Sequence, residues 1–279
     1  MGEIPLSQAA PYSSLELSVV IPAHNEAARI LLHLHSIVGY LNARAQTFEV
    51  IVVDDGSLDE TACVVHEYAK QAPSVRLLQL PTCAGKGAAV RHGMQAAQGH
   101  RQLFTDADGA TPITELARLE QALHSGAEIA IGSRSLAARR AEFTVDARWH
   151  RTFLGSVFNG IVRAAGITGI ADTQCGFKLF ERAVAQDLFS VACVNGYGFD
   201  LELLYVAQRR GYRIAEVPVN WSDQPGSKVR VIRDGLAMLH ELMIIHRNAT
   251  KGVYSIAPLP AHSLPSLPRL RSWNEAPYR

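Results

Sequence analysis

Strand-like and helix-like segments alternate along the first half of this chain, and that order limits the fold more than any other feature of the sequence. Two apolar runs rich in β-branched residues, 17–23 and 48–53, predict buried strands. Strands that alternate with helices favour βαβ units, so we expect an α/β fold with an open, mostly parallel sheet flanked by helices. The expected helices are one that opens at Asn25 and Glu26, then 59–71, 86–98 and 113–124, and the further strands are 75–80, 102–106 and 127–132.

The regular alternation stops after residue 132. Segment 133–148 is polar and arginine-rich and is expected to be a loop, and the part of the chain from Ala257 holds five of the thirteen prolines. We expect four units: a polar extension 1–16, the α/β domain 17–228, an amphipathic helix 229–250 and a Pro-rich, disordered tail 251–279. The remaining expected elements are helices at about 149–165, 199–210 and 229–248 and strands at 176–180 and 212–219.

Composition excludes several classes of protein. The 279 residues carry 27 basic and 26 acidic side chains, a net charge of +1, which argues against a polybasic nucleic-acid binder. The four cysteines contain no CxxC pair, so neither a zinc ribbon nor a disulfide scaffold is expected, and a reducing cytosol fits. No apolar run is long enough to span a bilayer, and the N-terminus does not resemble a secretory signal. We therefore expect a cytoplasmic protein, at most attached peripherally to the cytoplasmic face of a membrane.

Three predicted strands end in polar clusters, at 22–26, 54–57 and 106–109. The carboxyl ends of parallel strands meet at one edge of a sheet, which is where such sheets bind ligands. Carboxylates gathered there repel one another unless a cation lies among them. Asp106 and Asp108, on either side of Ala107, suit a site for a metal ion and a diphosphate. The alternative, that turn-forming Asp and Gly simply follow strands, stays open for any one cluster.

Lys86 stands between two glycines at a predicted helix start. The segment matches neither the P-loop nor the dinucleotide-binding pattern, because Gly87 follows the lysine and Val90 replaces the last glycine. A helix N-terminus with a lysine still favours an anion, although a plain N-terminal turn explains the segment equally well.

The stretch 134–163 contains six arginines and only two acidic residues. Arginine forks recognise phosphate with two parallel hydrogen bonds, so this stretch favours a second anionic substrate, and a solvated loop is the alternative. The histidines have no metal-ligand spacing, and no nucleophile elbow is present. Asp200 and Glu202 lie two apart on a predicted helix, and Asp200 can face the cleft.

Taken together, these motifs resemble those of inverting family 2 glycosyltransferases of the GT-A fold, a nucleotide-diphospho-sugar transferase-like architecture. The resemblance covers about residues 17–250 and is strongest to the dolichyl-phosphate β-glucosyltransferase branch. The segments that carry it are 19–26, 50–61, 85–94, 104–111, 132–134, 172–180, 198–212 and 216–228.

This resemblance implies a UDP-sugar donor, a polyprenyl phosphate acceptor (dolichyl or undecaprenyl) and Mg²⁺ or Mn²⁺. It implies that Asp106 and Asp108 bind the metal, and that Asp200 stands where relatives with hydroxyl acceptors place their base. The acceptor phosphate would be held by Arg134, Arg148 and Arg151. The nucleotide sugar would be bound by Pro22, Ala23, Asn25, Glu26, Asp54, Asp55, Ser57, Lys86, Asp106, Ala107 and Asp108.

Two features depart from related branches. Relatives that transfer mannose tend to have glutamine two places after the metal pair, where this chain has Ala110, so glucose is the expected sugar. Eukaryotic glucosyl enzymes carry an N-terminal membrane helix, and we expect none within this sequence. Helix 229–248 has an apolar side with basic residues near its ends, so it can lie at a lipid interface or pack on the sheet domain.

The expected chemistry needs little from the protein beyond positioning. A phosphomonoester is largely a dianion near pH 7, so it attacks the anomeric carbon without a general base. The alternatives are transfer to a sugar hydroxyl with Asp200 as base, a GDP-mannose donor, a nucleotide-binding protein without activity, and a haloacid-dehalogenase-like phosphatase built on 106–111.

Overall fold

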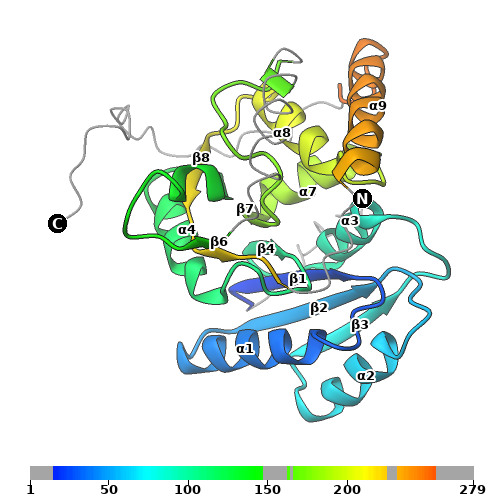
Figure 1. The fold of residues 1–279 in the computed structure, drawn as a ribbon, viewed down its shortest axis with the longest axis vertical. Coiled ribbons are helices and arrows are strands. Elements are labelled where there is room, and N and C mark those ends of the chain that lie inside the picture. Colours follow the sequence, from blue (N-terminus) through cyan, green and yellow to red (C-terminus); the bar gives the residue numbers. More distant parts are fainter. Residues whose placement is uncertain (1–14, 147–161, 164–165, 225–230, 256–279) are drawn as a thin grey trace, which may run out of the picture.

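The computed structural model describes residues 15–146, 162–163, 166–224 and 231–255 (Figure 1). Its main feature is a seven-stranded sheet in the order β3-β2-β1-β4-β7-β5-β8, which confirms the expected α/β class. The strands are β1 (Leu17–Ala23), β2 (Phe48–Asp54), β3 (Val75–Gln79), β4 (Arg101–Thr105), β5 (Ile129–Ser133), β7 (Phe177–Glu181) and β8 (Ile214–Pro218).

Strand β7 is antiparallel to both of its neighbours, β4 and β5, whereas the other pairs in this sheet are parallel. Phe104 lies opposite Lys178, and Ala130 lies opposite Leu179. Because β7 runs the other way, its N-terminal end lies at the edge where the parallel strands have their carboxyl ends. Segment 172–176, which directly precedes β7, therefore lies at that edge.

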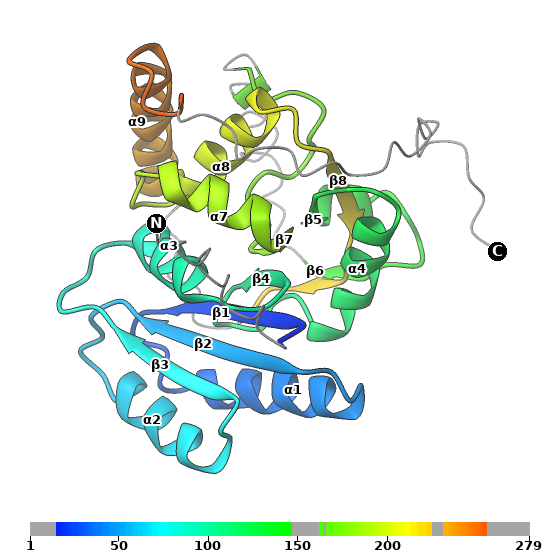
Figure 2. The ribbon, with the colours of Figure 1, turned by 180° about the vertical axis from the view of Figure 1, so that it is seen from behind.

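Helices cover both faces of the sheet (Figures 1 and 2). Alternate side chains along a strand point to opposite faces, so Val20 and Val53 belong to one apolar core and Val19 and Val52 to the other. The second core is completed by α1 (Ile30–Ala43), α2 (Thr61–Gln71) and α4 (Leu116–His124), which follows a 3₁₀ turn (Ile113–Glu115). The first core is completed by α3 (Lys86–Ala96), α7 (Arg182–Val191), α8 (Phe199–Arg209) and α9 (Val231–Thr250).

Three expectations about local structure are wrong. Helix α1 begins at Ile30 rather than at Asn25, because Asn25 has a left-handed backbone (φ 55°) that no helix accommodates. Segment 133–148 is not all loop, since it contains α5 (Arg134–Ala137) and β6 (Val145–Asp146), which pairs with β9 (Trp221–Ser222). Helix α7 was not expected at all.

Some expectations fall on residues outside the described part of the chain. These are most of the helix at 149–165, which includes Arg151, together with Arg148 and most of the N-terminal extension and the Pro-rich tail. The unit boundaries stay predictions. Within the described ranges, no helix combines the length and the apolarity that crossing a bilayer requires.

Candidate active site

Asp106 and Asp108 follow β4 at the carboxyl edge of the sheet, as predicted. The Asp108 carboxylate accepts a hydrogen bond from the Ala110 N–H (3.0 Å), and the Asp106 N–H donates to the Gly176 carbonyl (3.1 Å). Burial and the neighbouring charge of Asp106 raise the pKa of Asp108. Two carboxylates held so close together fit a hard divalent cation such as Mg²⁺ or Mn²⁺, which takes oxygen ligands.

Lys86 is the first residue of α3, and its ammonium nitrogen lies 2.7 Å from the Asp106 Oδ1 atom. The rings of Tyr197 and Phe199 approach the same nitrogen at 5.8 and 5.9 Å from their centroids. A cation at a helix N-terminus beside two carboxylates can bind a phosphate group while the carboxylates hold a metal. The structure therefore brings together two motifs that the sequence placed 20 residues apart.

Gly176, just before β7, leaves room for the Asp106 carboxylate. A Cβ atom at position 176 would lie 2.0 Å from the Asp106 Oδ2 atom, which is closer than any real contact. The close approach exists because β7 is antiparallel and starts beside the end of β4. Sequence reasoning included this glycine only within a longer segment of family resemblance and assigned it no role.

Asp55 fastens the loop that leads into α3. Its two carboxylate oxygens accept hydrogen bonds from the N–H groups of Ala84 (2.7 Å) and Gly85 (2.9 Å). The Asp55 N–H donates to the Ala23 carbonyl at 2.8 Å, so the ends of β1 and β2 and the loop after β3 are held together.

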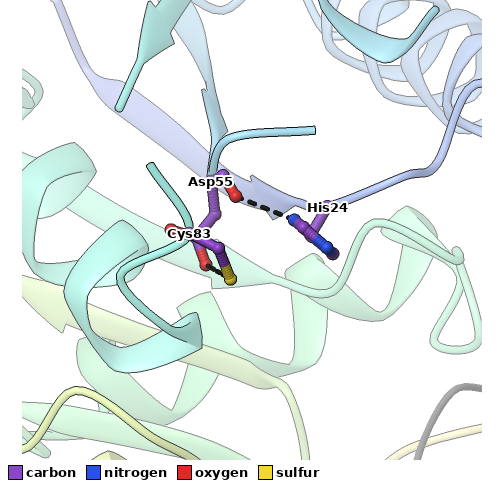
Figure 3. Close-up of side chains that lie close together, drawn as sticks. All are labelled: His24, Asp55 and Cys83. Carbon is purple, nitrogen blue, oxygen red and sulfur yellow. Dashed lines mark hydrogen bonds between the residues drawn. The ribbon is translucent and has the colours of Figure 1, made fainter. Parts of the chain in front are cut away.

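His24, Asp55 and Cys83 gather at this junction (Figure 3), and one side-chain ligand atom of each lies within 4.8 Å of the others. His24 Nδ1 donates to the Asp55 carbonyl (2.8 Å), and its Nε2 accepts from the Asn25 amide (3.1 Å). Cys83 Sγ lies 3.5 Å from the Asp55 Oδ2 atom. Because both imidazole nitrogens have partners within the protein, the cluster fastens two loops together and does not present an open metal site.

Other residues predicted to bind the nucleotide also lie at this edge, where they contact one another. The Asn25 N–H donates to the Ser57 hydroxyl (2.8 Å), and Asp54 accepts from the Ser57 N–H (3.2 Å). Glu26 forms an ion pair with Arg29, whose Nη2 lies 3.0 Å from the Glu26 Oε1 atom. Pro22, Ala23 and Ala107 complete the set, and nucleotide binding by these residues stays a prediction.

Two residues near the metal pair were missed by sequence reasoning. The pKa of Arg29 is raised, chiefly by its hydrogen bond to Glu26, with a contribution from the charge of Asp108. His33 is buried on the inner side of α1 beneath Gly109, and burial lowers its pKa to about 4. For His33, the sequence offered one signal of a place near the site, which is its position on the inward face of the predicted helix.

Arg134 lies at the same edge, at the end of β5, and is held by Asp172. Its Nε and Nη2 atoms donate to the two Asp172 oxygens at 2.7 and 2.8 Å, and its backbone N–H donates to Asp172 at 2.9 Å. The Trp221 ring lies 5.5 Å from the guanidinium carbon. Asp172 thereby fixes the guanidinium of Arg134, whose side chain is still 32% exposed.

Asp200 lies beneath the site in a sealed position. It is 2% exposed, and its Oδ1 atom accepts from the Lys178 ammonium at 2.5 Å. Lys178 is fully buried and also donates to the Cys175 carbonyl (2.6 Å). A carboxylate held in this way does not face an acceptor, so the geometry offers no support for Asp200 as a base.

An open, mostly parallel sheet with a carboxylate pair and a lysine at its carboxyl edge fits the class of α/β enzymes that bind nucleotides, and comparison with known proteins identifies the family. Residues 18–189 match the model of glycosyl transferase family 2. The chain belongs to this family and is a glycosyltransferase, which overturns the phosphatase interpretation.

The similar proteins agree with that assignment. A dolichyl-phosphate beta-glucosyltransferase of Trichomonas vaginalis is 42% identical over 82% of this chain and 70% of its own length. The dolichyl-phosphate beta-glucosyltransferase of Homo sapiens is 38% identical, over 86% of this chain and 78% of its own. Glucosyl-3-phosphoglycerate synthase from Mycobacterium tuberculosis, solved with UDP, shares the fold with a TM-score of 0.62 at 22% identity, over 83% of this chain and 80% of its own.

Proposed function

We propose that this enzyme transfers glucose from UDP-glucose to the phosphate of a polyprenyl phosphate, with inversion at the anomeric carbon and with Mg²⁺ or Mn²⁺ as cofactor. The observation that carries the proposal is the Lys86 ammonium, 2.7 Å from one of two adjacent carboxylates at the carboxyl edge of the sheet. That arrangement suits a diphosphate leaving group. The relatives named dolichyl-phosphate beta-glucosyltransferases support glucose as the sugar and a polyprenyl phosphate as the acceptor.

Some of the site residues would hold the metal ion, and others would bind the diphosphate leaving group. Asp106 and Asp108 would hold the divalent cation, which neutralises charge on the departing diphosphate. Lys86 adds a positive charge from the N-terminus of α3, where backbone N–H groups also favour an anion. Asp55 keeps this helix start in place through the N–H groups of Ala84 and Gly85.

A phosphate acceptor also agrees with the state of Asp200. A sugar hydroxyl would need a base to remove its proton, but Asp200 is buried and paired with Lys178. A phosphate dianion is already deprotonated near pH 7 and needs only to be oriented and neutralised. Arg134, fixed by Asp172, is the described residue best placed to do this, and Arg148 and Arg151 are proposed to join it.

The proposal is tested with a donor panel. We expect turnover of UDP-glucose with a short-chain polyprenyl phosphate and Mn²⁺ to exceed turnover of GDP-mannose and of UDP-N-acetylhexosamines. Preference for either of those donors would overturn the sugar assignment. Transfer to a hydroxyl group of a sugar, and not to the polyprenyl phosphate, would overturn the acceptor assignment.

The role of Arg134 leads to a kinetic prediction. Removing Arg134 alone would leave the buried Asp172 without its counter-charge and destabilise the fold, so the sharper variant is Arg134→Gln combined with Asp172→Asn. Losing one charge-assisted contact costs about 1.5–3 kcal/mol, or roughly ten- to hundredfold in kcat/KM. We expect that loss with polyprenyl phosphate, with UDP affinity unchanged.

Asp200→Asn is the comparison for this variant. Asparagine keeps an oxygen that accepts from Lys178, but the buried ammonium loses its counter-charge, so we expect a lower melting temperature. We expect its kcat to stay within a few-fold of wild type if the melting temperatures of both variants show folded protein. An inactive Asp200→Asn beside a fully active double variant would show that the acceptor is a hydroxyl group.

We also propose that the enzyme works at the cytoplasmic face of a membrane, with α9 at the lipid surface. One side of α9 packs on the sheet domain, because Leu242 and Ile245 are buried in the core. Another side is free to lie at a lipid interface, because Leu236, Met243 and Ile244 are exposed. Exposed apolar side chains on one helix are typical of interfacial attachment.

This attachment predicts a measurable loss of vesicle binding. Each large apolar side chain contributes roughly 1.5–3 kcal/mol when fully buried, so replacing Leu236, Met243 and Ile244 together with serine should weaken binding to anionic phosphatidylglycerol vesicles more than tenfold. Flotation at low salt measures the bound fraction. Equal flotation of the triple variant and the wild type would exclude α9 as the attachment surface.

A further inference from the structure

Residues 194–198, in the loop between α7 and α8, contact the start of α3, where the donor-site lysine lies. The Asn195 carbonyl accepts hydrogen bonds from the N–H groups of Gly87 (2.7 Å) and Ala88 (3.3 Å). The Arg91 Nη2 atom donates to the Asn195 side chain at 2.7 Å. The first turn of α3, which begins with Lys86, is thus fixed by this loop.

The two segments are also packed without space for side chains. A Cβ atom at Gly85 would lie 2.4 Å from the Asn195 carbonyl oxygen, and one at Gly87 would lie 2.5 Å from the Val194 carbonyl oxygen. Backbone packed against backbone in this way transmits displacement, because neither segment has a flexible side chain to absorb it. The position of the loop therefore sets the position of Lys86.

On its other side the same loop is held by Glu241 of α9. The Glu241 Oε2 atom accepts a hydrogen bond from the Gly198 N–H at 2.6 Å. Cβ atoms at Gly196 and Gly198 would lie 2.0 and 2.7 Å from the Glu241 carboxylate oxygens. Gly198 precedes α8 and has no side chain to cap that helix, so Glu241 supplies the capping carboxylate from a different helix.

We propose that Glu241 is a positioning residue for the donor diphosphate site. It holds loop 194–198, the loop holds the first turn of α3, and that turn places the Lys86 ammonium 2.7 Å from Asp106. The inference rests on the proposed function, because it takes Lys86 and Asp106 as the diphosphate site. It means that α9, which carries the proposed membrane surface, is connected to the donor site through the Glu241 carboxylate.

The effect of Glu241 should appear in donor binding and not in acceptor binding. Glu241→Ala releases the Gly198 N–H of the loop. We expect UDP affinity, measured by calorimetry with Mn²⁺, to fall about tenfold, which corresponds to the loss of one charge-assisted hydrogen bond. The KM for UDP-glucose should rise with it, while the KM for polyprenyl phosphate should stay unchanged. Glu241→Gln keeps one acceptor oxygen and should restore most of the affinity.

Ile245→Ala is the matched control, since Ile245 is buried one turn further along α9. It should lower the melting temperature at least as much as Glu241→Ala and leave UDP affinity unchanged. If Ile245→Ala weakens UDP binding equally, the effect belongs to α9 packing in general and the specific role of Glu241 is overturned. Unchanged UDP affinity in Glu241→Ala also overturns it, whereas a wild type that binds no UDP refutes the proposed function itself.

Discussion

Replacing Asp108 with asparagine should reduce glucosyl transfer by about 10³-fold, because a metal ion that stabilises a developing charge contributes several kcal/mol to the transition state. Asparagine keeps the shape of the side chain and its hydrogen bond to the Ala110 N–H, but it removes the charge that attracts the cation. Steady-state kcat with Mn²⁺ and UDP-glucose measures the loss, and binding of Mn²⁺ in the presence of UDP, followed by electron paramagnetic resonance, should weaken with it.

The fold should survive this substitution and become more stable. Burial and the charge of Asp106 raise the pKa of Asp108, so near pH 7 the ionised carboxylate lowers the stability of the metal-free protein relative to a neutral side chain. We therefore expect a higher melting temperature for metal-free Asp108→Asn than for the metal-free wild type, and differential scanning calorimetry measures the difference. Glu67→Gln, an exposed carboxylate on α2, is the control and should change neither quantity. Full activity of Asp108→Asn would contradict the metal assignment.

Gly176→Ala should be nearly as damaging, although it adds only one methyl group. The new Cβ atom would stand 2.0 Å from the Asp106 Oδ2 atom, so the carboxylate must rotate away from its position beside Lys86. A displacement of about 1 Å of a metal ligand commonly costs on the order of 10²-fold in rate. We expect kcat/KM for UDP-glucose to fall by about that factor.

Gly39→Ala provides the matched control for this glycine. Gly39 lies inside α1, and a methyl group added there would meet no neighbouring atom within 4 Å. Alanine at this position should therefore leave activity unchanged and stabilise the helix by up to ~1 kcal/mol. If Gly176→Ala retains wild-type kcat/KM, the fit of Asp106 against β7 has no catalytic consequence.

The sheet could be predicted from sequence wherever strands are local apolar runs. The segments that became β1 and β2 are buried on both faces, and such runs are distinctive because all of their residues except Ser18, Glu49 and Asp54 are apolar. The start of α1 was harder to predict from sequence, because it depends on the left-handed backbone of Asn25. A contact between residues 33 apart in the chain stabilises this conformation: the Leu58 N–H donates to the Asn25 side chain at 2.7 Å. Contacts at that separation leave no local pattern.

The site was predictable to the extent that it follows from strand order. Asp106 and Asp108 could be placed at the carboxyl edge because parallel strands bring their ends together, and Lys86 because it starts a helix. The bidentate partner of Arg134, by contrast, is Asp172, which is 38 residues away in the segment that precedes the antiparallel strand β7. The sealed state of Asp200 likewise depends on Lys178, whose burial no periodicity in the sequence indicates.

By itself, then, the sequence determined the α/β class and the sheet edge at which the carboxylate pair lies, since these depend on residue pattern and on the geometry common to all parallel sheets. Only the tertiary structure decided the direction of β7, the place of Gly176 against Asp106, the engagement of Asp200 and the link from Glu241 to α3. Those features depend on which distant backbone segments touch. Their energy comes from close packing and hydrogen bonds between residues far apart in the chain, and neither leaves a periodic signal in the sequence.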